Sequence, residues 1–210
     1  IELAADVASE AEVEALFDAA AARLGPPDIL VNNAGILRDS PLAETEAAAF
    51  DRVIAVNLRG PFLAARAFAR RRDSGRIINI ASDLGLLGRE GMSAYTASKG
   101  GVIALTRTLA RELAPDILVN TIAPGAVETD MTRPESMSAE QLARDMDTPL
   151  ARFGQPGEIA AMALFLAGPQ AGFITGQCIG VNGGSATSGS ARLLFRMMTK
   201  GAEKNSSNHR

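Results

Sequence analysis

Tyr95 and Lys99 are the two side chains of this sequence whose types and spacing most clearly suggest chemistry. Tyr95 is the only tyrosine in the chain, and Lys99 is the only lysine before residue 200. Residues four positions apart share one face of an α-helix, so the phenol and the ammonium are expected to be neighbours. A nearby positive charge favours phenolate and lowers the pKa of a tyrosine from its ordinary value of about 10. The pair therefore predicts a tyrosine that acts as a general acid or base.

The same spacing also occurs by chance on ordinary surface helices, so the interpretation depends on the elements around the pair. We interpret four short apolar runs as buried strands: 28–31, 76–81, 117–122 and 173–182, and we take residues 1–7 as the end of another. Helical patterns lie between them: from a Ser9–Glu12 capping box to Gly25, from Thr45 to about Val56, from Pro61 to Arg72, from Ala94 to Leu113, and from Pro156 to Leu166. Strands that alternate with helices predict an α/β protein with a parallel sheet covered on both sides.

Polar or small residues follow the predicted strands at their carboxyl ends. They are Asp6, the run Asn32 to Gly35, Ser82, and the pair Pro124-Gly125. Parallel sheets bind ligands in a crevice beyond these ends. Tyr95 comes one loop after Ser82, so the sequence places the tyrosine pair at the same crevice. The segment from Ala126 to Arg152 has a helical pattern interrupted by prolines, and we expect it to form a lid.

Composition narrows the class of protein. The chain has 210 residues, 47% of them hydrophobic and 21% charged, which suits one domain with a sizeable core. A net charge of −3 gives no reason to expect a nucleic acid or a membrane as partner, and we predict no metal site. The single cysteine, Cys178, allows no internal disulfide. No apolar run approaches the ~20 residues of a membrane span, and we expect a cytoplasmic protein.

Two stretches allow more than one interpretation. Small residues recur along the predicted helix at Ala97, Gly101, Ala104 and Thr108, and this stripe suits either a subunit contact or packing on the chain's own sheet. Residues 185–210 turn small, polar and then basic, and we expect a flexible tail beyond a domain at 1–184.

Taken together, these motifs resemble the short-chain dehydrogenase/reductase family in its single-domain form. The matching residues are Asp6-Val7, Asn32-Asn33-Ala34-Gly35, Asn57, Ser82, Tyr95 with Lys99, and Pro124-Gly125 followed by Val127 and Thr129. The resemblance runs from Ile1 to about Gly184. It implies a Rossmann-like, doubly wound parallel sheet and NAD(P)-linked interconversion of a small-molecule carbonyl compound and an alcohol.

The resemblance also implies roles for individual residues. Tyr95 is expected to exchange a proton with the substrate oxygen, Lys99 to lower its pKa and bind the nicotinamide ribose, and Ser82 to hold the substrate oxygen. Asn57 is expected to hold a water that links Lys99 to solvent. The residues implied in cofactor binding, besides Tyr95 and Lys99, are Asp6, Val7, Asn33, Ala34, Gly35, Pro124, Gly125, Val127 and Thr129. NADP is favoured over NAD, and a homotetramer or homodimer is expected.

Three phrases are similar to the 3-oxoacyl-(acyl-carrier-protein) reductases within the family: residues 33–39, 128–133 and 181–184. The sequence also departs from the family, because nothing in it matches the glycine-rich turn that binds the cofactor pyrophosphate. We therefore expect a chain truncated at its N-terminus, with the first strands absent and on the order of fifty residues missing. The alternative function is a non-catalytic fragment or scaffold that lacks the pyrophosphate site.

Overall fold

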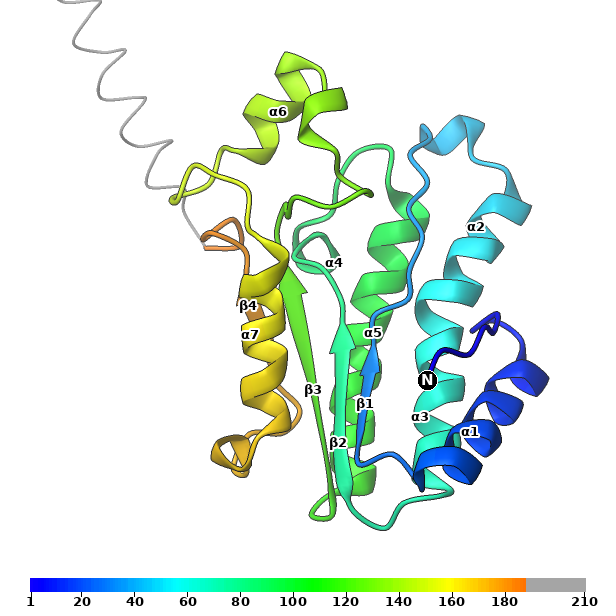
Figure 1. The fold of residues 1–210 in the computed structure, drawn as a ribbon. Coiled ribbons are helices and arrows are strands. Elements are labelled where there is room, and N and C mark those ends of the chain that lie inside the picture. The colour runs from blue at the N-terminus through cyan, green and yellow to red at the C-terminus, as the bar shows by residue number, and fades with distance from the viewer. Residues whose placement is uncertain (188–210) are drawn as a thin grey trace, which may run out of the picture.

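Four parallel strands form the centre of the molecule. The computed structural model describes residues 1–187, and residues 188–210 of the expected tail lie outside the described residues. The strands are β1 (Ile29–Asn32), β2 (Gly75–Ile80), β3 (Ile117–Pro124) and β4 (Cys178–Val181), and they lie side by side in that order (Figure 1). Every pairing is parallel; Ile78 of β2, for example, lies between Val31 and Asn120. The predicted α/β fold with a Rossmann-like, doubly wound sheet is confirmed.

Helices cover both faces of this sheet. The longer ones are α1 (Glu10–Leu24), α2 (Ala47–Ile54), α3 (Gly60–Ala69), α5 (Ser93–Leu113) and α7 (Pro156–Ala167), and the short ones are α4 (Leu84–Leu87) and α6 (Ala139–Asp145). Helices α3 and α5 pack on one face of the sheet, whereas α7 packs on the other (Figure 1). Among residues 1–187, no helix has the length and apolar character that crossing a bilayer requires.

The two faces of the sheet bury separate cores. Ile77 of β2 packs with Phe68 and Val119 under α3 and α5, and its neighbour Ile78 packs with Leu166 under α7. Successive residues of a strand point to opposite faces, so an unbroken apolar run is what a two-sided strand needs. Full burial of each such side chain contributes roughly 1.5–3 kcal/mol, and it fixes β2 and β3, whose ends carry the site.

Two strand predictions are wrong at the edges of the sheet. The expected burial of β1 on both faces fails, because Ile29 and Val31 are 45% and 46% exposed. Residues 1–7 form no strand; the Asp6 N–H donates to the Glu12 carboxylate at 2.8 Å instead of pairing in a ladder. The capping box is consequently half formed, since Ser9 Oγ accepts from the Glu12 N–H while the Glu12 side chain is engaged with Asp6.

The last strand is also shorter than predicted. It spans Cys178–Val181, although residues 174–177 run beside β3 without forming a ladder. There the Asn120 side chain donates to the Ile174 carbonyl at 2.7 Å and accepts from the Gln177 N–H at 3.1 Å. Thr175 Oγ1 accepts from the Val119 N–H at 3.1 Å. Two backbone bonds also join this stretch to β3: the Gly176 N–H donates to the Val119 carbonyl at 2.7 Å, and the Thr121 N–H donates to the Gln177 carbonyl at 2.8 Å. Side chains therefore replace only part of the expected strand pairing.

Helices α2 and α3 form one continuous helix through a wide turn. The predicted break before Pro61 is wrong: residues 55–59 adopt π-helical geometry and lead directly into α3. Proline has no N–H to donate to the preceding turn, and a locally widened turn accommodates that loss. Thr45 does not cap the helix either, because the N-cap is Glu46 and the Thr45 hydroxyl donates to the Pro41 carbonyl at 2.9 Å. The helix ends at Ala69, before Arg72.

The small residues along α5 were expected either to form a subunit contact or to pack on the chain's own sheet, and they do not all behave alike. Gly101 packs inside the chain, where an added Cβ would lie 2.7 Å from the Leu58 side chain. Ala97, Ala104 and Thr108 are exposed. Most of the stripe therefore does not pack on the chain's own sheet.

Candidate active site

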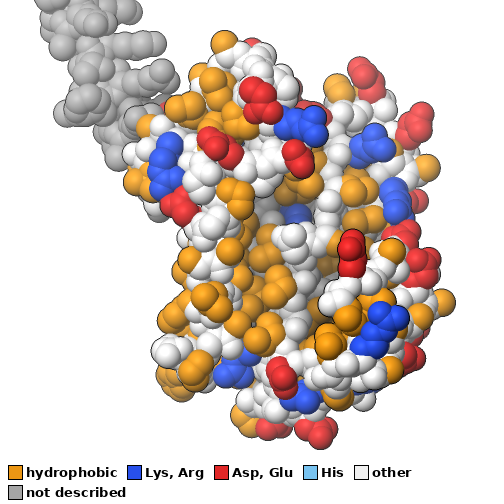
Figure 2. Space-filling view, in the orientation of Figure 1, with side chains coloured by type: hydrophobic (Ala, Val, Ile, Leu, Met, Phe, Trp, Pro, Cys, Tyr) orange, Lys and Arg blue, Asp and Glu red, His pale blue; other side chains and the backbone are white. Residues whose placement is uncertain are grey.

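A large cavity opens at the carboxyl ends of β1, β2 and β3. Its volume is about 1070 Å³, and α7 and the segment after β1 flank the hollow (Figure 2). The expected lid reaches over it, since Met131, Met137 and Asp145 belong to the lining. Ten residues of the predicted site line this one space: Asn33, Ala34, Gly35, Ser82, Tyr95, Lys99, Pro124, Gly125, Val127 and Thr129.

The other three predicted residues lie outside the cavity lining. Asp6 is at the surface, where its carboxylate accepts from the Arg52 guanidinium at 3.0 Å. Val7 lines a second, smaller cavity of about 270 Å³ beside β1. Asn57 is buried directly behind the main cavity.

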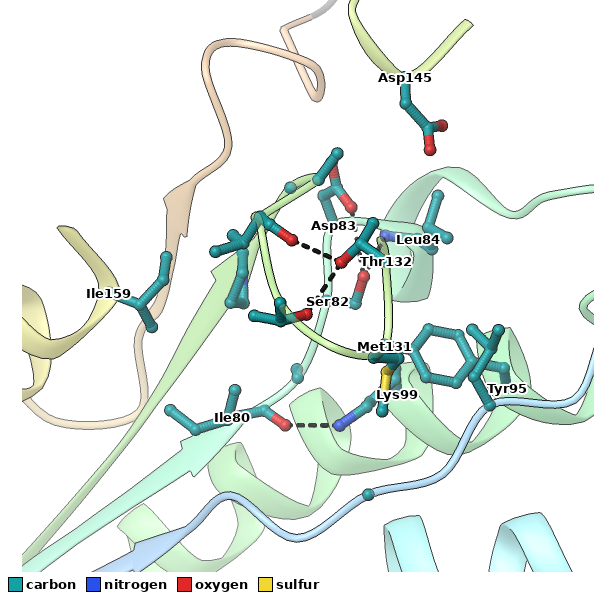
Figure 3. A pocket seen from close by; sticks show the side chains of 18 of the residues that line it. Ile80, Ser82, Asp83, Leu84, Tyr95, Lys99, Met131, Thr132, Asp145 and Ile159 are labelled. Carbon is teal, nitrogen blue, oxygen red and sulfur yellow. Dashed lines mark hydrogen bonds between the residues drawn. The ribbon is translucent and has the colours of Figure 1, made fainter. Parts of the chain in front are cut away.

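Tyr95 and Lys99 project from the first turns of α5, and both side chains are buried. The Lys99 ammonium lies 5.7 Å from the centre of the Tyr95 ring. Lys99 Nζ donates to the Ile80 carbonyl at 2.7 Å, as Figure 3 shows, at the very end of β2. Tyr95 and Lys99 therefore lie at the carboxyl end of β2, where the sequence placed them.

Burial changes the electrostatics that the spacing alone predicts. It raises the pKa of the Tyr95 phenol above 10.0, and the Ser82 hydroxyl only partly opposes this effect. Burial also lowers the pKa of Lys99 to about 8. The expectation that the bare protein favours a phenolate through a permanently charged lysine is therefore corrected, because removing both groups from water disfavours their charged forms.

Ser82 stands where β2 has just ended, next to Asp83. Its hydroxyl oxygen accepts from the Leu84 N–H at 3.2 Å and lies 3.2 Å from Asp83 Oδ1. The Asp83 N–H donates to the Pro124 carbonyl at 3.0 Å, which ties this turn to the end of β3. The Ser82 hydroxyl is thereby held in the cavity wall near Tyr95 (Figure 3).

Asn57 braces the site from behind. Its Oδ1 accepts from the Ile36 N–H at 2.8 Å, and its Nδ2 donates to the Ile36 carbonyl at 2.8 Å and to Ser98 Oγ at 3.2 Å. Ser98 Oγ in turn donates to the Tyr95 carbonyl at 2.7 Å. Asn57 therefore joins the segment after β1 to the helix that carries Tyr95. Asn32 of β1 links two strands, since its side chain donates to Asn79 Oδ1 of β2 at 2.8 Å.

Gly35 and Gly125 differ in how closely their surroundings pack. A Cβ added at Gly35 would make ordinary contacts, 3.4 Å from Asn57 Oδ1 and 3.6 Å from Lys99 Nζ. Gly125 allows a close approach to Asn182, where a Cβ would come within 2.9 Å of the backbone. The size of the cavity, its apolar and small-residue walls, and the polar groups converging at Tyr95 fit a nicotinamide cofactor together with a substrate.

Several polar residues of this cavity were not predicted from the sequence, and four of them form two bonded pairs. Asp83 and Ser185 line it and are hydrogen bonded to each other. Arg89 forms an ion pair with Asp145 of α6 at 2.7 Å, which ties the lid to the loop before α5. Asp83 was detectable as the residue that directly follows Ser82, whereas the ion pair joins distant segments without a local signal. Within residues 1–187, no group of three or more His, Cys, Asp or Glu side chains is placed to hold a metal ion.

Sequence comparison relates nearly all of this chain to known reductases. The family described as enoyl-(acyl carrier protein) reductase matches residues 1–186. A 3-oxoacyl-(acyl-carrier-protein) reductase from Synechocystis is 43% identical over 189 residues, which are 88% of this chain and 75% of that protein. The 3-oxoacyl-(acyl-carrier-protein) reductase FabG of Staphylococcus aureus is 45% identical over 186 residues, covering 86% and 74% of the two chains.

Solved structures give the same relationship. A protein described as blue fluorescent protein from a metagenomic library, in complex with NADPH, superposes with a TM-score of 0.81 and 41% identity, over 87% of this chain and 74% of that one. A Brucella melitensis protein described as short-chain dehydrogenase/reductase, glucose/ribitol dehydrogenase, superposes with a TM-score of 0.78 and 37% identity. The match covers 89% of this chain and 75% of that one. From the matched family, the identities and the shared fold, the chain belongs to the short-chain dehydrogenase/reductase family of oxidoreductases.

Proposed function

We propose that this protein is an NAD(P)-dependent oxidoreductase that interconverts a ketone and a secondary alcohol, with Tyr95 as the general acid and base. The observation that carries the proposal is the meeting of Tyr95, Lys99 and Ser82 in one buried cavity at the strand ends. Three polar groups that converge in a large, mostly apolar pocket are typical of an active site.

Each residue has a task that its contacts support. In the reducing direction, Tyr95 donates its phenolic proton to the carbonyl oxygen, and Ser82 donates a hydrogen bond to the same oxygen as negative charge develops there. A bound nicotinamide supplies the hydride. Lys99, held at the Ile80 carbonyl, stabilises the phenolate that Tyr95 leaves behind. Asn57 fixes the distance between the segment after β1 and α5. A water held by Asn57 links Lys99 to solvent, so that Lys99 can regain a proton.

The pKa of Lys99 supports the proposed proton transfer to Tyr95. Its pKa of about 8 lies near neutral pH, so the amine can pass a proton toward Tyr95 and be recharged from solvent. A phenol whose pKa is raised by burial stays protonated while it waits for a carbonyl substrate. Reduction is therefore the direction for which the resting site is prepared.

For the cofactor, we propose that Asn33, Ala34 and Gly35 form one wall and that Pro124, Gly125, Val127 and Thr129 hold the carboxamide end. NADP is favoured over NAD because the solved relative described above is an NADPH complex. We propose that Asp6 and Val7, which lie outside the main cavity, reach the adenine end of the cofactor. The proposed substrate is a ketone such as a 3-oxoacyl thioester, in keeping with the names of the sequence relatives.

We further propose a cytoplasmic homo-oligomer, a tetramer or dimer, without nucleic-acid or membrane partners. The exposed Ala97, Ala104 and Thr108 of α5 support an oligomer, because small exposed side chains let a second helix come close. The proposed domain is 1–184, although Ser185 is hydrogen bonded to Asp83 of the cavity wall.

The Tyr95→Phe variant tests the proposed function. It keeps the ring that packs in the cavity and removes only the proton donor, so ketone reduction is expected to fall by roughly 10²–10⁴-fold. Fluorescence titration with NADPH and NADH measures cofactor binding separately, and the affinity of the variant is expected to match that of the wild type.

Two results would count against the proposal. Reduction by Tyr95→Phe at the wild-type rate would remove Tyr95 from its role. Failure of the wild-type protein to bind either cofactor would favour the alternative of a non-catalytic scaffold.

A further inference from the structure

Asp83 is a buried carboxyl group in the wall of the cavity, and the proposed mechanism gives it no task. Its residue is only 5% exposed, and it directly follows Ser82. Its backbone is fixed to the end of β3 through the bond from its N–H to the Pro124 carbonyl. Figure 3 shows Asp83, Ser82 and Leu84 together at the turn after β2.

The partners of this carboxyl group are neutral hydroxyls. Oδ1 lies 3.2 Å from Ser82 Oγ, and Oδ2 accepts from Ser185 Oγ. Among the ion pairs formed by residues 1–187, none involves Asp83; the nearby Arg89 guanidinium is engaged with Asp145 at 2.7 Å. Ionising a buried carboxyl group that has no counterion costs free energy, and this favours its neutral form.

The two hydroxyl contacts also place the proton. Because Ser185 donates to Oδ2, that oxygen acts as the acceptor, and the proton of a neutral Asp83 belongs on Oδ1. Ser82 Oγ donates to Oδ1 at 3.2 Å when the carboxyl group is ionised, and protonation of Oδ1 reverses this bond, because the hydroxyl oxygen can also accept. An ionised carboxylate can only accept, so it would claim the Ser82 proton and put negative charge beside the developing alkoxide.

We propose that Asp83 is a positioning residue that works in its protonated form: it donates to Ser82 and so leaves the Ser82 hydroxyl free to donate to the substrate oxygen. No covalent bond forms or breaks in this step, and no proton leaves Asp83. This inference rests on the proposed function, since it assigns Ser82 to the substrate oxygen.

Charged groups around Asp83 shape its titration. Tyr95 and Lys99 of α5 line the same cavity, and the charge of Arg89, in the loop before that helix, acts on Asp83. The segment over the cavity adds Asp130, Arg144, Asp145 and Asp147. Burial raises the pKa of Asp83 above its ordinary value of 3.8, while the Ser185 and Ser82 hydroxyls, the Leu84 N–H and the Arg89 charge oppose the rise. Reduction should therefore weaken as pH rises through the Asp83 titration.

The kinetic test compares Asp83→Asn and Asp83→Ala with a matched control, Asp73→Asn, at an exposed turn. The asparagine NH₂ can donate to Ser82 as a protonated Asp83 does, so this variant should reduce ketones within about threefold of the wild type and lose the falling limb of its kcat/KM profile that belongs to Asp83. The alanine variant lacks the donor and should lose about tenfold or more in kcat/KM.

The control Asp73→Asn should keep the wild-type profile. An asparagine variant as impaired as the alanine one, with a wild-type rate that rises through the Asp83 titration, would overturn the proposal.

A second measurement needs neither turnover nor a variant. In ¹³C-labelled wild-type protein, the Asp83 carboxyl carbon is assigned through its backbone correlations to Ser82 and Leu84 and is followed by NMR against pH. We expect a midpoint above 3.8, high enough that Asp83 is protonated at the pH of the ketone-reduction assay. A midpoint below the pH of that assay overturns the role of Asp83 even in a fully active enzyme. Absence of ketone reduction by the wild type, with Asp83 still protonated, would instead count against the proposed function.

Discussion

Lys99 shows how one buried side chain links catalysis to stability. Its folded-state pKa of about 8 lies below its ordinary value of 10.5, so between these pH values the unfolded chain binds the proton that the folded chain has lost. Stability must therefore rise with pH across this window, as the cost of burying the charged amine is relieved. The full difference corresponds to about 3 kcal/mol. Below pH 8 the folded protein therefore carries the cost of burying a charged amine beside Tyr95.

The Lys99→Met variant tests this linkage, because methionine has a similar length and no charge. Relative to the wild type, the variant is expected to be more stable at pH 7 than at pH 10.5. The difference between the two free energies of unfolding should change by up to about 3 kcal/mol over this range, because only the wild type gains stability as Lys99 loses its proton. Urea unfolding at several pH values measures this difference, and ionisations shared by both proteins cancel in it. A difference that stays constant from pH 7 to pH 10.5 would mean that Lys99 keeps an ordinary pKa.

At the residue scale, the sequence predicted positions better than it predicted electrostatics. The spacing of Tyr95 and Lys99 and the place of Ser82 after a strand were enough to bring the three into one cavity. The direction of the Tyr95 pKa shift was not predictable from spacing, because it depends on how much water the folded chain excludes. Asp83 was missed for the same reason, since only the fold shows that its carboxyl group is buried and forms no ion pair with another of residues 1–187.

At the element scale, α4, which begins two residues after Ser82, packs closely against α5, which carries Lys99. A Cβ added at Gly85 of α4 would lie 2.8 Å from the backbone of Lys99 and of Gly100 on α5. Backbone atoms cannot rotate away as a side chain can, so alanine at this position must push the two helices apart. Regular periodicity predicted α1, α5 and α7 well, whereas this close approach has no periodic signal.

The paired variants Gly85→Ala and Gly157→Ala test this contact with the same chemical change in two helices. Gly85→Ala is expected to lose about 1–3 kcal/mol of unfolding free energy and to lower kcat, because the turn after β2 moves away from Lys99. Gly157 of α7 has nothing within 4 Å of an added Cβ, so Gly157→Ala is expected to be neutral or to gain up to about 1 kcal/mol. Equal effects in urea unfolding and turnover would show that the close approach does not position the site.

Other elements could not be derived from local pattern because their partners decide them. The apolar run of β1 predicted burial on both faces, yet Ile29 and Val31 lie half exposed at the sheet edge. The stretch 173–182 has the composition of a strand, but bonds through the side chains of Asn120 and Thr175 replace part of the backbone pairing in its first half. The wide turn at 55–59 keeps α2 and α3 continuous where proline indicated a new start.

At the scale of the whole molecule, the open face of α5 leads us to expect self-association. Ala104→Glu places a charged side chain on this face and is expected to shift the protein toward smaller species in analytical ultracentrifugation. Ala15→Glu makes the same change on the exposed side of α1 and serves as the control. A wild-type protein that sediments as a monomer, or an Ala104→Glu variant that associates like the wild type, would remove α5 from any subunit contact.

Transfer of labelled hydride from the cofactor to a ketone tests the proposed reaction. Wild-type protein is incubated with a ketone and with NADPH that carries deuterium at the transferable position of its nicotinamide ring, and the product is analysed by mass spectrometry. We expect a secondary alcohol with one deuterium on its carbinol carbon, formed by the wild type and lost in Tyr95→Phe. Unchanged ketone and cofactor, or an alcohol without deuterium, would contradict the proposed reaction.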